Sequence, residues 1–302
     1  MYEQISANKR RSALIIGGFV VFAFVIAFVV TSLLRLGPIG VVFAAVFALV
    51  SSFVSYWSSD KVALAVSRAK PADAREYARY HNLVEGLCIA GGLPKPRLYI
   101  VDDPAPNAFA TGRNPQHAAV AVTTGLLEKM NRVELEGVLA HELSHVKNYD
   151  ILVMTIAITM VGFIALVADF FARWAFWGGL GGGHDRDDDN NNPFGVILAI
   201  AGVLLVILAP IIARLMQMSI SRQREYLADA SAVSLTRYPP GLISALEKLK
   251  GDTTVVHTST KATAHLWIEA PLDETPGKKR SFDNLFSTHP PIDDRIAALE
   301  EM

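Results

Sequence analysis

Four long apolar runs interrupt an otherwise polar chain, at residues 13–34, 39–57, 151–171 and 194–212. A helix of about 20 apolar residues crosses a bilayer core, so each run is long enough to span a membrane. The third run carries Asp169 near its end and the fourth carries Pro210. For this second pair, a buried hairpin packed against the protein therefore stays open as an alternative. The pattern predicts two pairs of transmembrane helices, in residues 1–60 and 151–217.

The polar segment 61–150 predicts a small domain of helices and strands. Residues 71–92 have the pattern of an amphipathic helix ended by Gly91 and Gly92. Residues 97–101 and 117–122 are short β-rich runs, and we expect them to form a small antiparallel sheet. Residues 131–148 contain no proline, and Asn131 with Glu134 resembles a capping box, which predicts a further helix. The last segment, 218–302, has a helical and polar pattern from Ser221 onward.

Composition and charge place the chain in a bilayer. Hydrophobic residues make up 51% of the sequence and charged residues 19%, which is too apolar for an ordinary soluble enzyme. The net charge of -1 favours no polyanion, so we expect no nucleic-acid partner. Basic residues flank the first pair of runs, and the positive-inside rule then places the polar domain in the cytoplasm. These residues are Lys9, Arg10, Arg11, Lys61, Arg68 and Lys70.

Two further features agree with a multi-pass protein of the cytoplasmic membrane. The first apolar run is longer than a typical signal core and no small-residue cleavage site follows it, so we expect no cleaved signal peptide. The single cysteine, Cys88, cannot form an intramolecular disulfide, which fits a reducing compartment. We interpret Cys88 as a small buried apolar side chain.

The most informative residues are His141-Glu142-Leu143-Ser144-His145, within the helix expected at 131–148. Two histidines four residues apart lie on one face of a helix, so both imidazoles can reach one metal ion. Glu142 lies beside them, where a carboxylate can take a proton from an attacking water. The alternative is that the two histidines have ordinary structural roles. The motif predicts a zinc hydrolase.

A catalytic zinc has three protein ligands and one open position, so a third ligand is needed. Residues 178–192 are rich in glycine and aspartate, but we expect a disordered loop there, on the far side of the membrane, and the pattern of a calcium-binding EF-hand loop is incomplete. In the helical segment 221–230, Glu225 and Asp229 share a face. Glu225 can bind zinc while Asp229 supports a ligand histidine. Alternatively, both pair with Arg222 and Arg224 on a solvated face.

Together these motifs resemble the HtpX family of membrane-integrated zinc metalloproteases, which is related to the CAAX prenyl proteases. The resemblance covers nearly the whole chain and also includes Asn107-Ala108-Phe109-Ala110-Thr111-Gly112, residues 146–150 and Ser287-Thr288-His289-Pro290-Pro291. It implies a gluzincin-type endopeptidase of the cytoplasmic membrane, active in quality control of membrane proteins and often under stress. The acidic, glycine-rich loop at 178–192 departs from a typical member.

We expect one zinc ion per chain, bound by His141, His145 and Glu225, with Glu142 as the general base and Asp229 behind a ligand. A substrate can add as a β-strand to the backbone of Asn107, Ala108, Phe109 and Ala110. By resemblance, His289 helps to stabilise the oxyanion, with Arg295 as a weaker candidate. The alternative for His289 is a helix-entry residue before Pro290.

The expected fold class is an α+β membrane protein, in which a mostly helical zincin-type catalytic domain with a small antiparallel sheet accompanies four transmembrane helices. The expected substrates are membrane proteins or unfolded polypeptides. Two other functions stay open, namely a CAAX-type processing protease and a zinc-stabilised, non-proteolytic membrane scaffold or chaperone. The sequence does not specify an oligomeric state.

Overall fold

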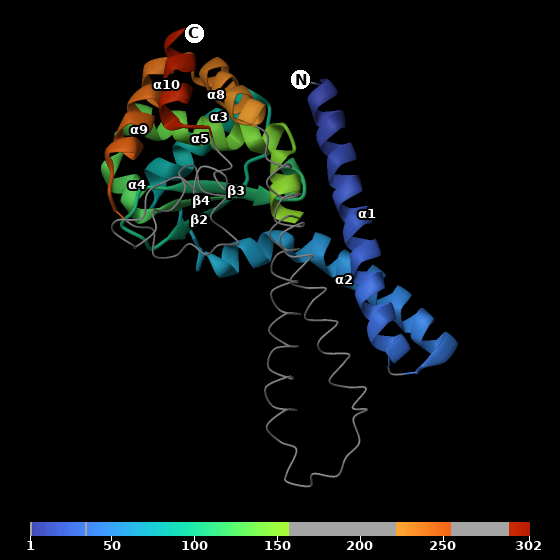
Figure 1. Cartoon of the computed structure of the whole chain (residues 1–302). Coiled ribbons are helices and arrows are strands. Elements are labelled where there is room, and N and C mark those ends of the chain that lie inside the picture. Colours follow the sequence, from blue (N-terminus) through green and yellow to red (C-terminus); the bar gives the residue numbers. More distant parts are fainter. Residues whose placement is uncertain (1, 34, 157–221, 255–289) are drawn as a thin grey trace.

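The computed structural model describes residues 2–33, 35–156, 222–254 and 290–302, and most of these residues are helical (Figure 1). The helices are α1 (Tyr2–Leu33), α2 (Gly37–Val66), α3 (Ala78–Gly91), α4 (Thr124–Lys129), α5 (Arg132–Lys147), α8 (Arg222–Thr236), α9 (Pro239–Gly251) and α10 (Ile292–Glu300). The strands are β1 (Lys70–Pro71), β2 (Arg97–Val101), β3 (Ala108–Gly112) and β4 (Ala118–Thr123). His289, the loop at 178–192, most of the third apolar run and all of the fourth lie outside the described residues.

The four strands form one mixed sheet in the order β1-β2-β4-β3. The expected antiparallel pairing of residues 97–101 with 117–122 is wrong, because β2 and β4 pair in parallel, with Arg97 opposite Ala119. The cause is the intervening strand β3, which forms an antiparallel pair with β4 and lies on the side of β4 away from β2. After β2, the chain therefore forms β3 two positions away in the sheet and then returns to form β4 in the position between β2 and β3. This order leaves β3 at the edge of the sheet.

Helix α3 is shorter than expected, because it begins at Ala78 rather than near residue 71. Lys70 and Pro71 pair with β2 instead, and the Asp73 carboxylate accepts hydrogen bonds from the backbone N–H groups of Arg75 and Glu76, which forms a turn. The predicted end is confirmed, since Gly91 is the last helical residue and Gly92 follows in the left-handed conformation.

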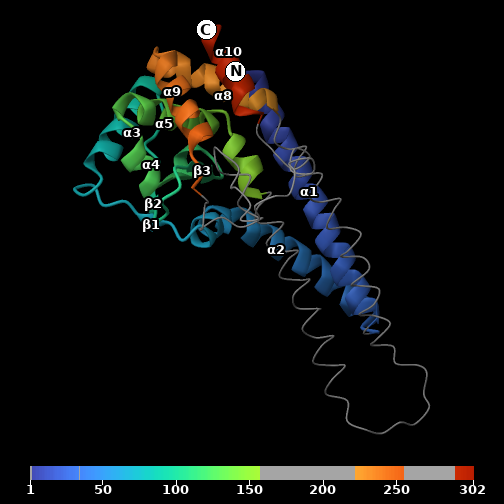
Figure 2. The ribbon, with the colours of Figure 1, turned by 60° about the vertical axis from the view of Figure 1, so that its left-hand side comes forward.

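Both faces of the sheet are covered (Figures 1 and 2). On one face, Leu98, Ile100, Val120 and Val122 pack into a core that also contains residues of α3, α5, α8, α9 and α10. On the other face, Phe109 packs in a cluster with Ala63 and Leu64 near the end of α2. Every residue of β4 is buried as a result, in keeping with a strand that is covered on both sides.

Helices α1 and α2 form an antiparallel hairpin that extends away from the sheet (Figure 2). Within the part of the chain that the structure describes, Gly37–Ser58 is the one helical segment long and apolar enough to cross a membrane, and α1 contains a shorter apolar segment at Ser12–Phe28. The large apolar side chains of α2 are exposed along its length, as lipid-facing residues are, and include Ile39, Val42, Phe43, Leu49 and Phe53. The prediction of a span at residues 39–57 is therefore supported by length, composition and exposure.

The zinc helix expected at residues 131–148 is present as α5, and its capping box is complete. The Asn131 side chain accepts a hydrogen bond from the Glu134 N–H, and the Glu134 carboxylate accepts one from the Asn131 N–H. Helix α9 crosses α5 at two glycines, and a Cβ added to Gly137 would lie 2.9 Å from the Leu242 backbone. This close packing holds α5 between the sheet and the C-terminal helices.

Candidate metal centre

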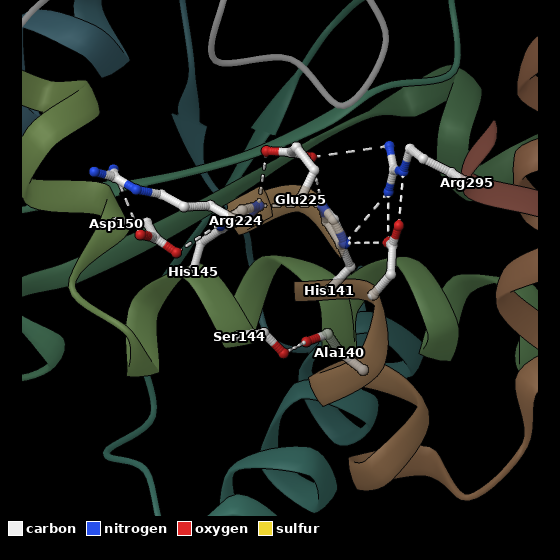
Figure 3. Close-up of polar contacts among 9 residues, drawn as sticks. Ala140, His141, Ser144, His145, Asp150, Arg224, Glu225 and Arg295 are labelled. Atoms are coloured by element: carbon white, nitrogen blue, oxygen red, sulfur yellow. Dashed lines mark hydrogen bonds and ion pairs between the residues drawn. The ribbon is translucent and has the colours of Figure 1, made fainter. Parts of the chain in front are cut away.

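Helix α5 carries His141 and His145 on one face, inside the domain. Every residue from Gly137 to Val146 is buried, and the two imidazole rings are perpendicular with their centroids 4.7 Å apart. Helix α8 brings Glu225 to the same place (Figure 3). The alternative in which Glu225 and Asp229 lie on a solvated face is wrong, since their exposed fractions are 0% and 2%.

Three ligand atoms of these residues converge on one point. The Nε2 atoms of His141 and His145 are 3.1 Å apart. The Glu225 carboxylate lies 3.5 Å from the Nε2 of His141 through Oε2, and 3.6 Å from the Nε2 of His145 through Oε1. One ligand atom from each residue lies within 4.8 Å of the others. The sequence prediction had placed the same three residues around one ion.

His141 is held from behind by an aspartate and an arginine. Its Nδ1 lies 2.8 Å from Oδ1 of Asp229, which is the support that the sequence predicted for Asp229. The Asp229 carboxylate in turn accepts hydrogen bonds from Nε and NH2 of Arg295, at 2.9 and 2.7 Å. Arg295 is fully buried, and its NH1 lies 4.0 Å from Oε2 of Glu225. The guanidinium of Arg295 therefore lies against the acidic residues of the centre.

His145 is held in the same way by two residues that sequence reasoning had not assigned. Its Nδ1 lies 3.2 Å from Oδ2 of Asp150, and NH1 of Arg224 lies 3.6 Å from Oδ1 of Asp150 (Figure 3). Both side chains are buried. The available signal was weak, because Asp150 follows His145 by five residues across the end of α5, and only the fold shows that the chain turns back there. Each ligand histidine thus has an aspartate behind it and an arginine behind the aspartate.

The donor set fits a zinc ion. A carboxylate only accepts hydrogen bonds, so each imidazole donates its Nδ1 hydrogen, and each neutral ring then directs an Nε2 lone pair at its neighbours. Two lone pairs and a carboxylate at 3.1 to 3.6 Å repel one another unless a cation lies between them. Ligands about 2.0–2.1 Å from zinc lie roughly 3.4 Å from one another in a tetrahedral site. His141, His145 and Glu225 form a zinc-binding triad of this kind.

The carboxylates also change how the ligands titrate. Burial and the Arg295 guanidinium lower the pKa of His141, but Asp229 and Glu225 outweigh them and raise it from 6.5 to about 9. Burial lowers the pKa of His145 as well, and Glu225 and Asp150 offset it, so that this pKa is also raised. Without metal, a proton on His141 therefore takes the place of the cation at neutral pH.

We expect zinc affinity to fall as the pH is lowered below about 9, because zinc must displace the proton that the raised pKa keeps on His141. Above the raised pKa the ring is already neutral, so the affinity should level off there. Competition with a chelator across about pH 6 to 10 measures this dependence, and calorimetry in buffers of different ionisation enthalpy counts the released protons. An affinity that does not change with pH over this range would contradict the expectation.

The remaining predicted residues differ in where the structure places them. Glu142 is buried on α5. Burial lowers the pKa of the Arg295 guanidinium, but three carboxylates, those of Asp229, Glu225 and Glu142, outweigh this effect and raise it. Glu142 therefore interacts electrostatically with the Arg295 guanidinium of the metal centre. In the stretch expected to bind substrate, Ala108 to Ala110 form the start of the edge strand β3, and Asn107 directly precedes this strand. His289 lies outside the described residues.

Comparison with known proteins gives the same family at several levels. Residues 74–302 match Peptidase family M48. The chain is 42% identical over 302 residues to a protease HtpX homolog of Caldanaerobacter subterraneus. This alignment covers 100% of this chain and 98% of the relative. It is 44% identical to the homolog of Limosilactobacillus reuteri and 45% identical to that of Listeria monocytogenes, with 100% of both chains covered in each case.

A solved structure shares the fold. Ste24p of S. mikatae matches with a TM-score of 0.52 at 18% sequence identity, over 99% of this chain and 67% of that one. From the metal-binding triad on α5 and α8 and from these full-length relatives, it follows that the chain belongs to peptidase family M48, as a metalloprotease of the HtpX type.

Proposed function

We propose that this metalloprotease is a zinc-dependent endopeptidase of the cytoplasmic membrane, which degrades misfolded or damaged membrane proteins with its catalytic domain in the cytoplasm. The observation that carries the proposal is the convergence of His141, His145 and Glu225 on one point, directly beside Glu142 on the same helix. A purely structural zinc site needs no general base next to its ligands. This argues against a zinc-stabilised scaffold or chaperone.

In the proposed mechanism, Glu142 takes a proton from the attacking water and later gives it to the leaving amine. The chemistry that bound zinc supplies is Lewis acidity, which polarises the scissile carbonyl. Asp229 and Asp150 hold the Nδ1 atoms of the two ligand histidines and so keep both Nε2 atoms directed inward. Arg295 balances the negative charge of Asp229 and Glu225. It acts behind the ligands, and we therefore assign it to support of the centre rather than to contact with the oxyanion.

The proposed substrate strand is β3. Among the described residues, this strand pairs with another strand on one side only, and we propose that an extended peptide takes its other side. Main-chain hydrogen bonds give affinity without requiring one sequence, which suits an enzyme that acts on damaged proteins of many kinds. Helix α5 contacts β3 directly, so a peptide on this edge lies beside the helix that carries the zinc ligands.

The proposed topology follows from charge and packing. Lys61 lies near the end of α2, Arg68 follows this helix, and Lys70 belongs to β1 of the sheet. The positive-inside rule places such basic residues in the cytoplasm. Residues 61–150 and 218–302 then form one cytoplasmic domain, in agreement with a core that α3, α5, α8, α9 and α10 share. The apolar segments 1–60 and 151–217 are the proposed membrane parts.

The test is cleavage of an unfolded membrane protein and of casein by the purified protein in detergent, with zinc. We expect wild type to cleave both, and a chelator to abolish cleavage. Glu225→Ala should lose zinc and activity together, because it removes one of three ligands. Glu247→Ala removes an exposed glutamate of α9 and serves as the matched control with full activity.

Three results would contradict parts of the proposal. Wild type that binds one zinc but cleaves neither substrate would favour the scaffold function. Cleavage of prenylated peptides alone would favour the CAAX-type processing protease. Unchanged zinc content in Glu225→Ala would remove this residue from the metal site.

A further inference from the structure

The chain segment that joins the zinc helix to the third apolar run touches both halves of the proposed active site. We call residues 150–156 the root segment; they are helical and buried. The segment follows Tyr149, whose φ of 62° turns the chain sharply after α5. Its first residue, Asp150, lies 3.2 Å from Nδ1 of His145. The root segment therefore begins directly behind a zinc ligand.

The other end of the root segment contacts the proposed substrate strand through Thr155. The Gly112 N–H donates a hydrogen bond to the Thr155 hydroxyl oxygen at 3.1 Å, and the Thr111 hydroxyl lies 3.0 Å from the same oxygen. The Thr155 hydroxyl donates to the backbone carbonyl of Ile151. Thr111 and Thr155 are both fully buried. The N–H at the end of β3 is thus satisfied by a side chain and not by another strand.

This contact lies on the edge of β3 that faces away from β4, which has no strand partner among the described residues and which we call the free edge. Backbone N–H groups of alternate residues in a strand point to the same side. The N–H of Gly112 is directed to Thr155 and away from β4, so the N–H of Ala110 faces the same free edge. Thr155 therefore occupies, at Gly112, the place that the next residue of an added strand would take. Pairing by a substrate is left to the positions before it.

Gly112 itself fixes how close this end of the strand can come to its neighbours. Its φ is +136°, and a Cβ would lie 2.5 Å from the carbonyl oxygen of His117. At the other end of β3, the Asn107 N–H donates to the Thr123 hydroxyl at 2.9 Å. The strand is therefore fixed at both ends by threonine hydroxyls, one from β4 and one from the root segment.

The root segment also packs against both N-terminal helices. Leu152 and Ile156 form a cluster with Phe19 of α1. Met154 packs with Ala63 and Leu64 of α2, in the cluster that contains Phe109 of β3. A displacement of the root segment relative to these helices would therefore move Asp150 and Thr155 together.

We propose that Thr155 is a positioning residue for substrate binding. It closes the free edge of β3 at Gly112 and holds this strand in register with the metal centre, to which the same segment is attached through Asp150. The inference rests on the proposed function of β3 as the substrate strand. It assigns to the root segment a direct part in aligning the peptide with the zinc ligands.

The test compares Thr155→Val, which keeps the shape and removes the hydroxyl, with Thr155→Ser, which keeps the hydroxyl. For a peptide substrate, we expect Thr155→Val to raise KM about tenfold, through the unsatisfied Gly112 N–H and the loosened strand, with kcat within about twofold of wild type. Thr155→Ser should restore the wild-type KM. Zinc affinity should stay unchanged in both variants, because the hydroxyl contacts the strand and no ligand.

A second measurement does not depend on turnover. In the Glu142→Gln background, the dissociation constant of an uncleaved peptide should rise about tenfold with Thr155→Val and stay unchanged with Thr155→Ser. Thr236→Val is the matched control, because the Thr236 hydroxyl bonds only local backbone groups among the described residues, the Ala232 carbonyl and the Tyr238 N–H, and it contacts neither β3 nor a zinc ligand. This control should bind the peptide as the background does.

The outcomes separate this inference from the proposed function. A wild-type KM and peptide affinity in Thr155→Val would overturn the inference and leave the protease intact. An equal loss in Thr155→Ser and Thr155→Val would also overturn it, since packing and not the hydroxyl would then be responsible. If wild type neither cleaved nor bound any peptide, the proposed function would fail, and this inference with it.

Discussion

Replacing Glu142 with glutamine is expected to abolish peptide cleavage while zinc stays bound. Glutamine keeps the size of the side chain but cannot accept the proton of the attacking water, and loss of such a general base typically costs about 10²–10⁴ in kcat. His141, His145 and Glu225 are unchanged in this variant, so the ligand set is complete. Single-turnover cleavage and zinc content, measured on the same preparation, test the two halves of this prediction.

Glu136→Gln provides the control, because Glu136 lies on the same helix and is only partly buried. It should retain wild-type kcat. Full activity of a zinc-loaded Glu142→Gln would show that another group takes the proton, and the mechanism would be wrong. Loss of zinc in Glu142→Gln would instead show that Glu142 is needed to form the centre.

Replacing Arg295 with methionine is expected to destabilise the protein strongly. Arg295 is fully buried and makes two hydrogen bonds to Asp229, with Glu225 at 4.0 Å. Removing one partner of a buried ion pair leaves the other charge uncompensated, which typically costs about 3–5 kcal/mol. Thermal unfolding of the metal-free protein in detergent measures this loss, and Arg132→Met, at an exposed position of α5, is the control.

The pH dependence of the stability loss in Arg295→Met shows whether the lost ion pair causes it. Burial raises the pKa of Asp229, but Arg295 and His141 outweigh it and lower the pKa to about 2. A carboxyl group with a lowered pKa stabilises the folded state at pH values above its pKa of 3.8 in the unfolded chain. This stabilisation is lost as the pH falls towards the folded-state pKa of about 2. Without Arg295 the pKa of Asp229 rises, so the loss of unfolding free energy in Arg295→Met should grow from acid to neutral pH. A deficit that is independent of pH would point to lost packing instead.

The sequence predicted the metal centre well because its parts are local patterns. The helix at residues 131–148 is specified by its capping box, and four-residue spacing puts His141 and His145 on one face whatever the surrounding fold. Glu225 was predicted by helical spacing together with the need for a third ligand. Cys88 is buried as expected, and burial raises its pKa to about 11, which keeps it an unreactive thiol.

Contacts made by chain reversal could not be predicted in this way. The link from Asp150 to His145 depends on the turn at Tyr149, and the support from Arg224 depends on how α8 lies across α5. The parallel pairing of β2 with β4 depends on which side of β4 the strand β3 takes, which alternation of apolar residues does not encode. The sequence pattern predicted where the strands lie but not which strands pair with one another.

The contact between His141 and Arg295 has a consequence for biosynthesis. Arg295 is translated 154 residues after His141, and Glu225 also comes later than the two histidines. A nascent chain that has emerged only as far as α5 thus contains the histidines and Glu142 without the third ligand or the balancing guanidinium. Such a chain has two of the three zinc ligands. The metal centre of the described structure is complete only once α8 and α10 have packed against α5.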